Sequence, residues 1–139
     1  MKRFAEILSF LIVIFAGNVL AKSVSAPEAG KVAVTFLNYK SAKPVFLIDA
    51  ATHFKHTFDG HDIFHVFNFE EKGFVITSAD DRFFPVLAWS VDSHFPDDKL
   101  PENVKSWMTW YEKQIASALE DPHYHAMHHQ KEWEILIAG

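Results

Sequence analysis

The residues of this sequence with the most obvious chemical potential are its nine histidines. The densest group lies near the C-terminus, where His123 and His125 could share a metal ion on a strand, and His125 with His128 or His129 could do so on a helix. No carboxylate is spaced as in a zinc motif, so these four histidines are weak metal candidates beside the simpler interpretation of a solvated polar tail. We therefore predict no metal and no other cofactor.

The sequence offers little for catalysis. It contains no cysteine, which excludes a thiolate nucleophile, disulfides and thiolate metal sites. Ser78 and Ser90 fall at the ends of predicted strands, without the sharp glycine-flanked turn that exposes a serine nucleophile. Asp80 and Asp81 could act as an acidic pair, but adjacent aspartates on a turn usually bind the backbone. We predict that the protein is not an enzyme.

The composition is that of one folded domain with an acidic surface. Of the 139 residues, 49% are hydrophobic and fourteen are Phe, enough for one core. The formal net charge is −5. This balance argues against nucleic acid or an anionic membrane as the partner.

Residues 1–21 have the layout of a secretory signal peptide. Lys2 and Arg3 precede a short apolar run over 7–16, and small residues lead to Ala21, after which we expect cleavage. The run is short for a membrane span, and no basic stop-transfer cluster follows it. The sequence therefore predicts a bacterial protein that is exported to the periplasm or secreted, with residues 22–26 as a flexible lead and no stable membrane association.

Two helices are predicted from apolar residues at spacings of three and four. The first, over 27–40, begins with Pro27 and Glu28, which suit a helix start. The second begins at Pro101 and ends before Pro122. Trp110 lies off the apolar stripe of this second helix, so it is either half covered by a neighbouring segment or offered to a partner.

Strands are predicted over 63–69, 74–78 and 85–90, with 50–60 as an edge strand or an irregular loop and 45–48 as a strand or a lead-in. In the strand over 63–69, alternation places Ile63, His65, Phe67 and Phe69 on one face. The link over 70–73 is too short for a parallel crossover. We therefore predict an α+β fold, in which two main helices pack on an antiparallel sheet of about four strands. The tail over 122–139 is predicted as a terminal strand or an extension.

These elements, in this order, resemble the prosegment of streptopain-type cysteine proteases, a domain that also occurs as a free inhibitor of those enzymes. The most specific part is Gly-Phe-Val-Ile-Thr-Ser-Ala-Asp-Asp-Arg at 73–82, followed by Pro-Val-Leu-Ala-Trp-Ser at 85–90 and the helix that opens with Glu-Asn-Val at 102–104. The similarity defines a domain over 27–121. Ala88 stands where the family often has glycine, and the match is poor over 45–60.

The resemblance implies steric inhibition: the domain docks beside the protease cleft, and the loop before the second helix reaches toward the catalytic dyad. In this sequence the implied inhibitory residues are Asp97, Asp98, Pro101, Glu102 and Asn103, with Phe95 and Trp110 as possible further interface residues. A polar side chain at a helix start can enter a subsite without presenting a cleavable bond in the attack geometry. Asn103 could instead cap its own helix.

The predicted function is therefore that of an exported inhibitor, whose partner is a streptopain-like, papain-fold cysteine protease. Within the same family, the chain could instead be an orphaned prosegment that assists folding or is a remnant. An alternative from a different functional class is an exported metal-binding module that uses the His-rich tail over 122–139.

Overall fold

The computed structural model describes residues 22–46, 50–70, 73–96, 98–121, 123–124 and 129–139. The predicted signal peptide lies outside these residues, as do residues 47–48 of the apolar run over 45–48. The elements are α1 (Ala26–Lys40), β1 (Ala50–Phe58), β2 (His61–Phe69), β3 (Phe74–Ser78), β4 (Val86–Ser90), α2 (Glu102–Glu120) and α3 (Gln130–Ala138). The strands form one antiparallel sheet in the order β1-β2-β3-β4. The predicted α+β class is confirmed, with 50–58 as an edge strand.

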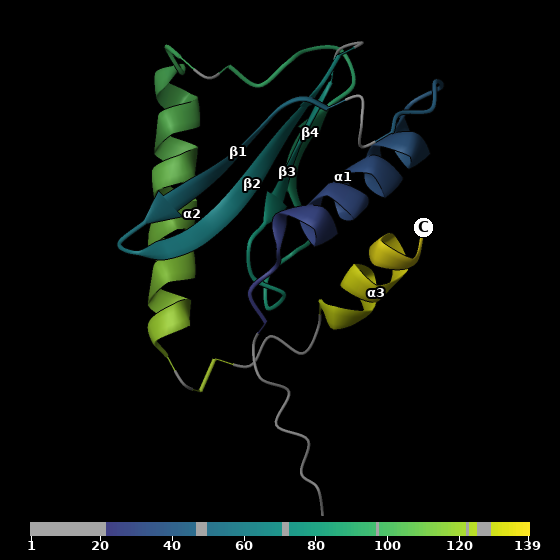
Figure 1. Ribbon diagram of the computed structural model, residues 1–139. Helices are drawn as coiled ribbons and strands as arrows, with labels where there is room; N and C mark the ends of the chain where they lie inside the picture. The colour runs from purple at the N-terminus through teal and green to yellow at the C-terminus, as the bar shows by residue number, and fades with distance from the viewer. Residues whose placement is uncertain (1–21, 47–49, 71–72, 97, 122, 125–128) are drawn as a thin grey trace, which may run out of the picture.

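The sheet lies between two helical layers, with α2 on one face and α1 and α3 on the other (Figure 1). Each face has its own hydrophobic core. The core under α2 includes Ile63, Phe64, Val66, Ile76, Phe95, Met108 and Ile115. The core under α1 and α3 includes Val32, Leu37, Phe67, Phe69, Val75 and Trp133. Apolar residues are buried on both sides of β2 and β3, which explains why neither strand shows a polar, solvent-facing side.

A β-bulge in β2 changes the predicted alternation of its side chains. His56 pairs with Phe64 and Thr57 with Asp62, so Ile63 has no partner across β1. The extra residue turns Ile63 to the α2 core, beside Phe64. The prediction that Ile63 shares a face with Phe67 and Phe69 is therefore wrong, because strict alternation holds only where the pairing is regular.

The segment that precedes α1 is held against the sheet, in contrast to the flexible lead predicted over 22–26. Ser23 forms an antiparallel bridge with Asp80, and the Val24 amide donates to the Ala79 carbonyl at 2.8 Å. Ser25 and Glu28 then form a capping box that starts α1. Hydrogen bonds from Lys22 and Ser25 lower the pKa of Glu28 to about 2.

The C-terminal residues form a third helix, in contrast to the strand or extension predicted for the tail. In sequence, Trp133, Ile135 and Ile137 alternate as in a strand. In the fold, Trp133 and Leu136 pack on the α1 core while Ile135 and Ile137 are exposed. The Trp133 indole also donates to the Phe83 carbonyl at 2.9 Å. Trp133 and Leu136 are three residues apart, so both side chains can face the same core in a helix but not in a strand.

Within the described ranges, none of the helices combines the length and hydrophobicity needed to span a bilayer.

Candidate functional site

The loop that leads into α2 is pinned to the middle of the sheet by Asn68 of β2. The Asn68 amide nitrogen donates to the Phe95 carbonyl at 2.9 Å, and its oxygen accepts from the Phe95 amide at 2.8 Å. His94 adds a hydrogen bond to the Phe69 carbonyl at 2.6 Å. The Phe95 ring is only 6% exposed, in the α2 core. Phe95 is therefore an anchor whose ring the Asn68 clamp holds inward, and its role as an interface residue stays a prediction.

Beyond this anchor the candidate inhibitory residues lie at the surface. Asp98, Pro101, Glu102 and Asn103 are all exposed, whereas Asp97 lies outside the described residues. Pro101 occupies the N-cap of α2, and its carbonyl accepts from the amides of Val104 and Lys105, both at 3.0 Å. No side chain caps α2. The alternative role of Asn103, as a cap of its own helix, is therefore not what the structure shows.

An exposed stripe continues from Asn103 along the outer face of α2. Asn103 and Trp110 are seven residues apart, about two helical turns, so they lie on the same side of the helix. Trp110 is 54% exposed and packs edge-on against Tyr111, with 5.1 Å between ring centroids. About half of this side chain is therefore covered, and its contact with a partner stays a prediction.

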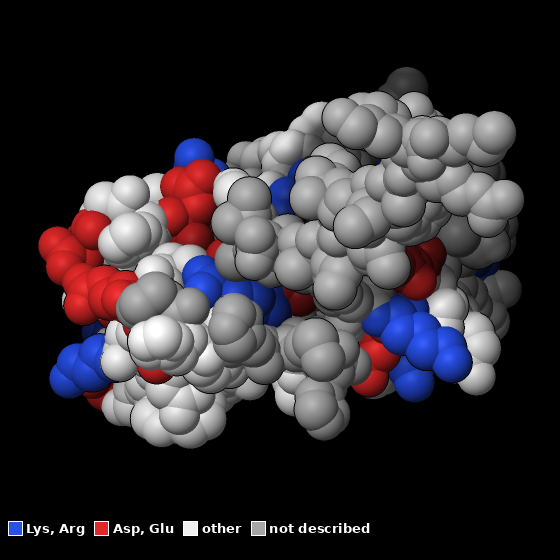
Figure 2. Space-filling view, turned by 90° about the horizontal axis from the view of Figure 1, so that it is seen from below, with Lys and Arg blue, Asp and Glu red and all other residues white. Residues whose placement is uncertain are grey.

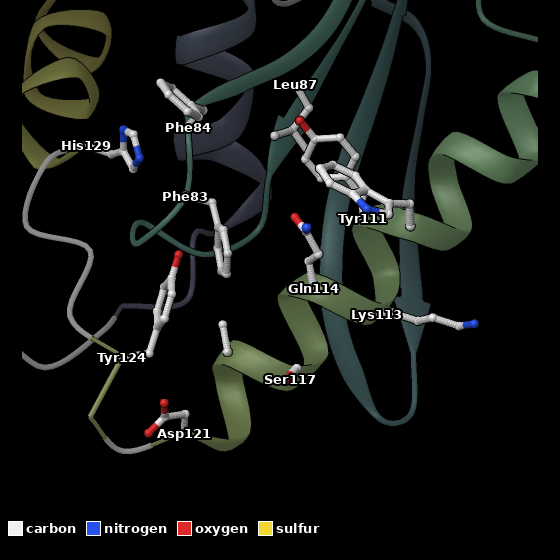
Figure 3. Close-up of a pocket in the computed structure, with 12 residues that line it drawn as sticks. Phe83, Phe84, Leu87, Tyr111, Lys113, Gln114, Ser117, Asp121, Tyr124 and His129 are labelled. Carbon is white, nitrogen blue, oxygen red and sulfur yellow. The ribbon is translucent and has the colours of Figure 1, made fainter.

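From Trp110 toward the C-terminal end of α2, the exposed stripe borders a groove of about 720 Å³. Figure 3 shows it between α2 and the β3–β4 loop, with Gln114 pointing toward Phe83 and Lys113 pointing away. Phe83 of this loop stacks on Tyr124, which follows α2, with 5.6 Å between the ring centroids. The groove walls also include Phe84, Leu87, Trp110, Tyr111, Ser117 and His129. This groove was not among the sequence predictions, because its walls come from three separate segments.

The most specific sequence motif, at 73–82, is structural. Asp80 is buried, and its two carboxylate oxygens accept from Arg82 Nε at 2.9 Å and Nη2 at 3.1 Å. Arg82 Nη1 reaches the Ala118 carbonyl near the end of α2 at 3.3 Å. Asp81 accepts from the backbone nitrogen of Lys22 at 2.9 Å. Both aspartates therefore bind groups of their own fold, which leaves no free acidic pair for acid–base chemistry.

The C-terminal histidines do not converge on one point in the described part of the chain. His123 donates its backbone amide to Asp121, and His129 lies beside Glu132 and Phe84. His125 and His128 lie outside the described residues. Among the residues described, no three His, Cys, Asp or Glu side chains gather as metal ligands would.

A pair of histidines in the sheet makes the fold sensitive to pH. Burial lowers the pKa of His65, and burial with the nearby His65 and Lys55 lowers the pKa of His53. Below their unfolded pKa of about 6.5, the unfolded chain binds more protons than the native protein. We therefore expect the free energy of unfolding to fall as the pH drops from 7.5 to 5.5, by at most about 1.4 kcal/mol per pH unit from the buried His65 and by less from His53, which is exposed and screened by solvent.

Urea unfolding at intervals of half a pH unit measures this slope. Glu28 does not contribute in this range, because the stability from its lowered pKa is lost only below about 4.5. His53→Gln should flatten the profile, and an unchanged slope in this variant would show that other groups set the dependence.

The charged groups of the surface are mixed in sign. On the face shown in Figure 2, acidic and basic side chains lie next to each other. At the start of α2, for example, Glu102 pairs with Lys105 at 2.7 Å. The exposed stripe of α2 therefore offers aromatic and polar groups to a partner more than it offers net charge.

Comparison with known proteins identifies the domain. The family model described as Spi protease inhibitor matches residues 21–115, more than half of the chain. The thiol protease/hemagglutinin PrtT of Porphyromonas gingivalis is 36% identical over 59 residues, which cover 42% of this chain and 7% of PrtT. No solved structure matches significantly. The matched region spans α1, the sheet and most of α2, and stops short of α3. The predicted resemblance is confirmed, and the chain belongs to the Spi protease inhibitor family.

Proposed function

We propose that this protein inhibits a streptopain-like, papain-fold cysteine protease, by placing the start of α2 and the preceding loop in the active-site cleft. Membership of a protease inhibitor family supports an inhibitory or prosegment role. The partial match to a thiol protease supports an enzyme with a cysteine nucleophile as the partner. The observation that carries the proposal is the Asn68 clamp, which fixes the loop while Asn103 stays exposed and is not needed as a cap.

Two physical features make this segment suited to block a cleft without being cut. The clamp holds Phe95, near the start of this loop, before binding, so less conformational entropy is lost there in the complex. Asn103 lies in the first turn of a helix, where the peptide bonds are already engaged in helical geometry. Its side chain can donate and accept hydrogen bonds in a subsite, while the helical backbone at Asn103 presents no extended peptide for attack. The exposed Trp110 adds a second anchor two turns along α2.

Inhibition of a purified protease tests this proposal. Residues 22–139 should inhibit a streptopain-like protease at a 1:1 ratio, whereas Asn103→Ala should raise the inhibition constant about tenfold or more. Trp110→Ala should act in the same direction, mainly through faster dissociation. Glu120→Gln, at the exposed far end of α2, is the matched control and should inhibit like the wild type. If the wild type inhibits no such enzyme, or if all variants inhibit equally, the proposed mechanism is wrong.

A prosegment role is the second candidate, because the matching segment of PrtT belongs to a much longer protease chain. A prosegment assists the folding of its catalytic domain, whereas a dedicated inhibitor only binds the mature enzyme. Refolding a streptopain-like catalytic domain with and without this protein distinguishes the two. A higher yield of active enzyme after removal of the protein favours the prosegment role.

We also propose that the protein acts after export and cleavage behind Ala21. Cleavage there would turn the backbone nitrogen of Lys22 into a charged α-amino group. In the structure this nitrogen lies 2.9 Å from the Asp81 carboxylate, so the new charge would gain an ion-pair partner. Sequencing the N-terminus of the exported protein tests this, because a mature chain that begins elsewhere than Lys22 contradicts it.

A further inference from the structure

Two histidines of the sheet point at each other on the face opposite α2. His53 Nε2 in β1 and His65 Nδ1 in β2 are 3.2 Å apart. In the strand register, His53 faces Phe67 and Lys55 faces His65, so the two histidines are diagonal neighbours. His53 also stacks on Phe67, with 4.6 Å between ring centroids. The pair is therefore held by two adjacent strands and not by a loop.

The protonation of His65 is set by the backbone. Its Nε2 lies 3.0 Å from the Val24 carbonyl, and because a carbonyl only accepts, this nitrogen carries the proton. Nδ1 of His65 is then a lone-pair donor aimed at His53. A metal-binding histidine usually donates its other ring N–H to a carbonyl or carboxylate in the same way. His65 is thus oriented as a ligand would be.

From this geometry we propose that His53 and His65 bind a divalent transition metal ion such as Zn²⁺ or Ni²⁺. Two imidazole nitrogens on one tetrahedral zinc ion are about 3.3 Å apart, given zinc–nitrogen bonds of about 2.0–2.1 Å. The observed separation of 3.2 Å matches this distance, and binding requires the rings to tilt so that both lone pairs point at the metal instead of along the present hydrogen bond. His53 is exposed, so its ring can tilt on its stack with Phe67 and move its proton to Nδ1 through solvent. Water would fill the remaining positions on the open side.

The surroundings explain why such a site would be selective for imidazole-binding metals and of modest affinity. Two neutral nitrogens favour Zn²⁺, Ni²⁺ and Cu²⁺ over Ca²⁺ and Mg²⁺, which prefer oxygen. The nearby Lys55 opposes cation binding, although it is paired with Asp62 at 2.9 Å. Its removal should therefore strengthen binding and free the Asp62 carboxylate.

Calorimetric titration with ZnCl₂ and NiCl₂ at pH 7.5 tests the proposal. A variant with glutamine at positions 123, 125, 128 and 129 removes the tail histidines and should still bind one equivalent of metal. In that background His53→Gln should weaken binding at least tenfold, whereas Lys55→Gln should tighten it severalfold. His53 is preferred to His65 for substitution because it is exposed, so its loss leaves the buried His65 bond to Val24 in place.

A spectroscopic signal separates this site from non-specific binding. In ¹⁵N-labelled protein the metal should shift the His65 Nδ1 and His53 Nε2 resonances, while His65 Nε2 keeps its proton. The proposal is overturned if the tail variant binds no metal at 1:1 ratio, or if His53→Gln binds as well as its parent. Protease inhibition is measured separately, so failure here leaves the inhibitor proposal untouched.

Discussion

Replacing Asp80 by asparagine should destabilise the protein by about 3 kcal/mol, the lower end of the range for breaking a buried ion pair. Asp80 is 5% exposed, and the Arg82 side chain that it binds through both oxygens is 13% exposed. An amide cannot accept from Arg82 at both positions, so the guanidinium would lose a charged partner in a poorly hydrated place. The remaining exposure of Arg82 keeps the loss from being larger.

The destabilisation should extend beyond the turn at Asp80, because the Asp80–Arg82 pair connects segments that are far apart in the sequence. Ser23 bridges to Asp80 ahead of α1, and Arg82 reaches the Ala118 carbonyl of α2. Urea unfolding followed by tryptophan fluorescence measures the change. Asp92→Asn, at an exposed turn, is the control and should stay within about 0.5 kcal/mol of the wild type. A change below about 1 kcal/mol in Asp80→Asn would show that the pair is not structural.

Replacing Asn68 by alanine should affect both stability and inhibition. It leaves the buried amide and carbonyl of Phe95 without partners, at a cost of about 2–4 kcal/mol in total. It also frees the loop that carries the candidate inhibitory residues. We therefore expect the inhibition constant to rise by more than tenfold under conditions where circular dichroism shows the variant to be folded. Asn68→Asp should not restore the clamp, since it keeps an acceptor for the Phe95 amide but sets a buried carboxylate against the Phe95 carbonyl.

The chain contains a matched control for this experiment. Asn38 of α1 holds Val45 by the same two bonds, with its amide nitrogen on the Val45 carbonyl at 3.0 Å and its oxygen on the Val45 amide at 2.5 Å. This clamp is on the α1 side of the sheet, and its two bonds hold Val45 and not the Phe95 backbone. Asn38→Ala should lower stability and leave inhibition by the folded protein unchanged. Equal losses of inhibition in both variants would mean that the loop before α2 has no special role.

The sequence by itself determined the elements whose signals are local. The spacing of apolar residues in α1 and α2, the proline and acid at each helix start, and the short β2–β3 link all act within a few residues. The motif at 73–82 also indicated the family, because all the residues that define it lie in ten consecutive positions.

Only the tertiary structure decided the features that depend on residues far apart in the chain. From the sequence alone, Phe95 is a candidate interface residue. In the structure, Asn68, 27 positions away, binds its backbone and holds its ring inward. The tail alternates like a strand, and only the docking of Trp133 on the α1 core makes it helical. The His53–His65 pair and the groove beside Trp110 likewise need the strand register and the α2 packing. Such contacts are stabilised by burial of groups from separate segments, which no local pattern encodes.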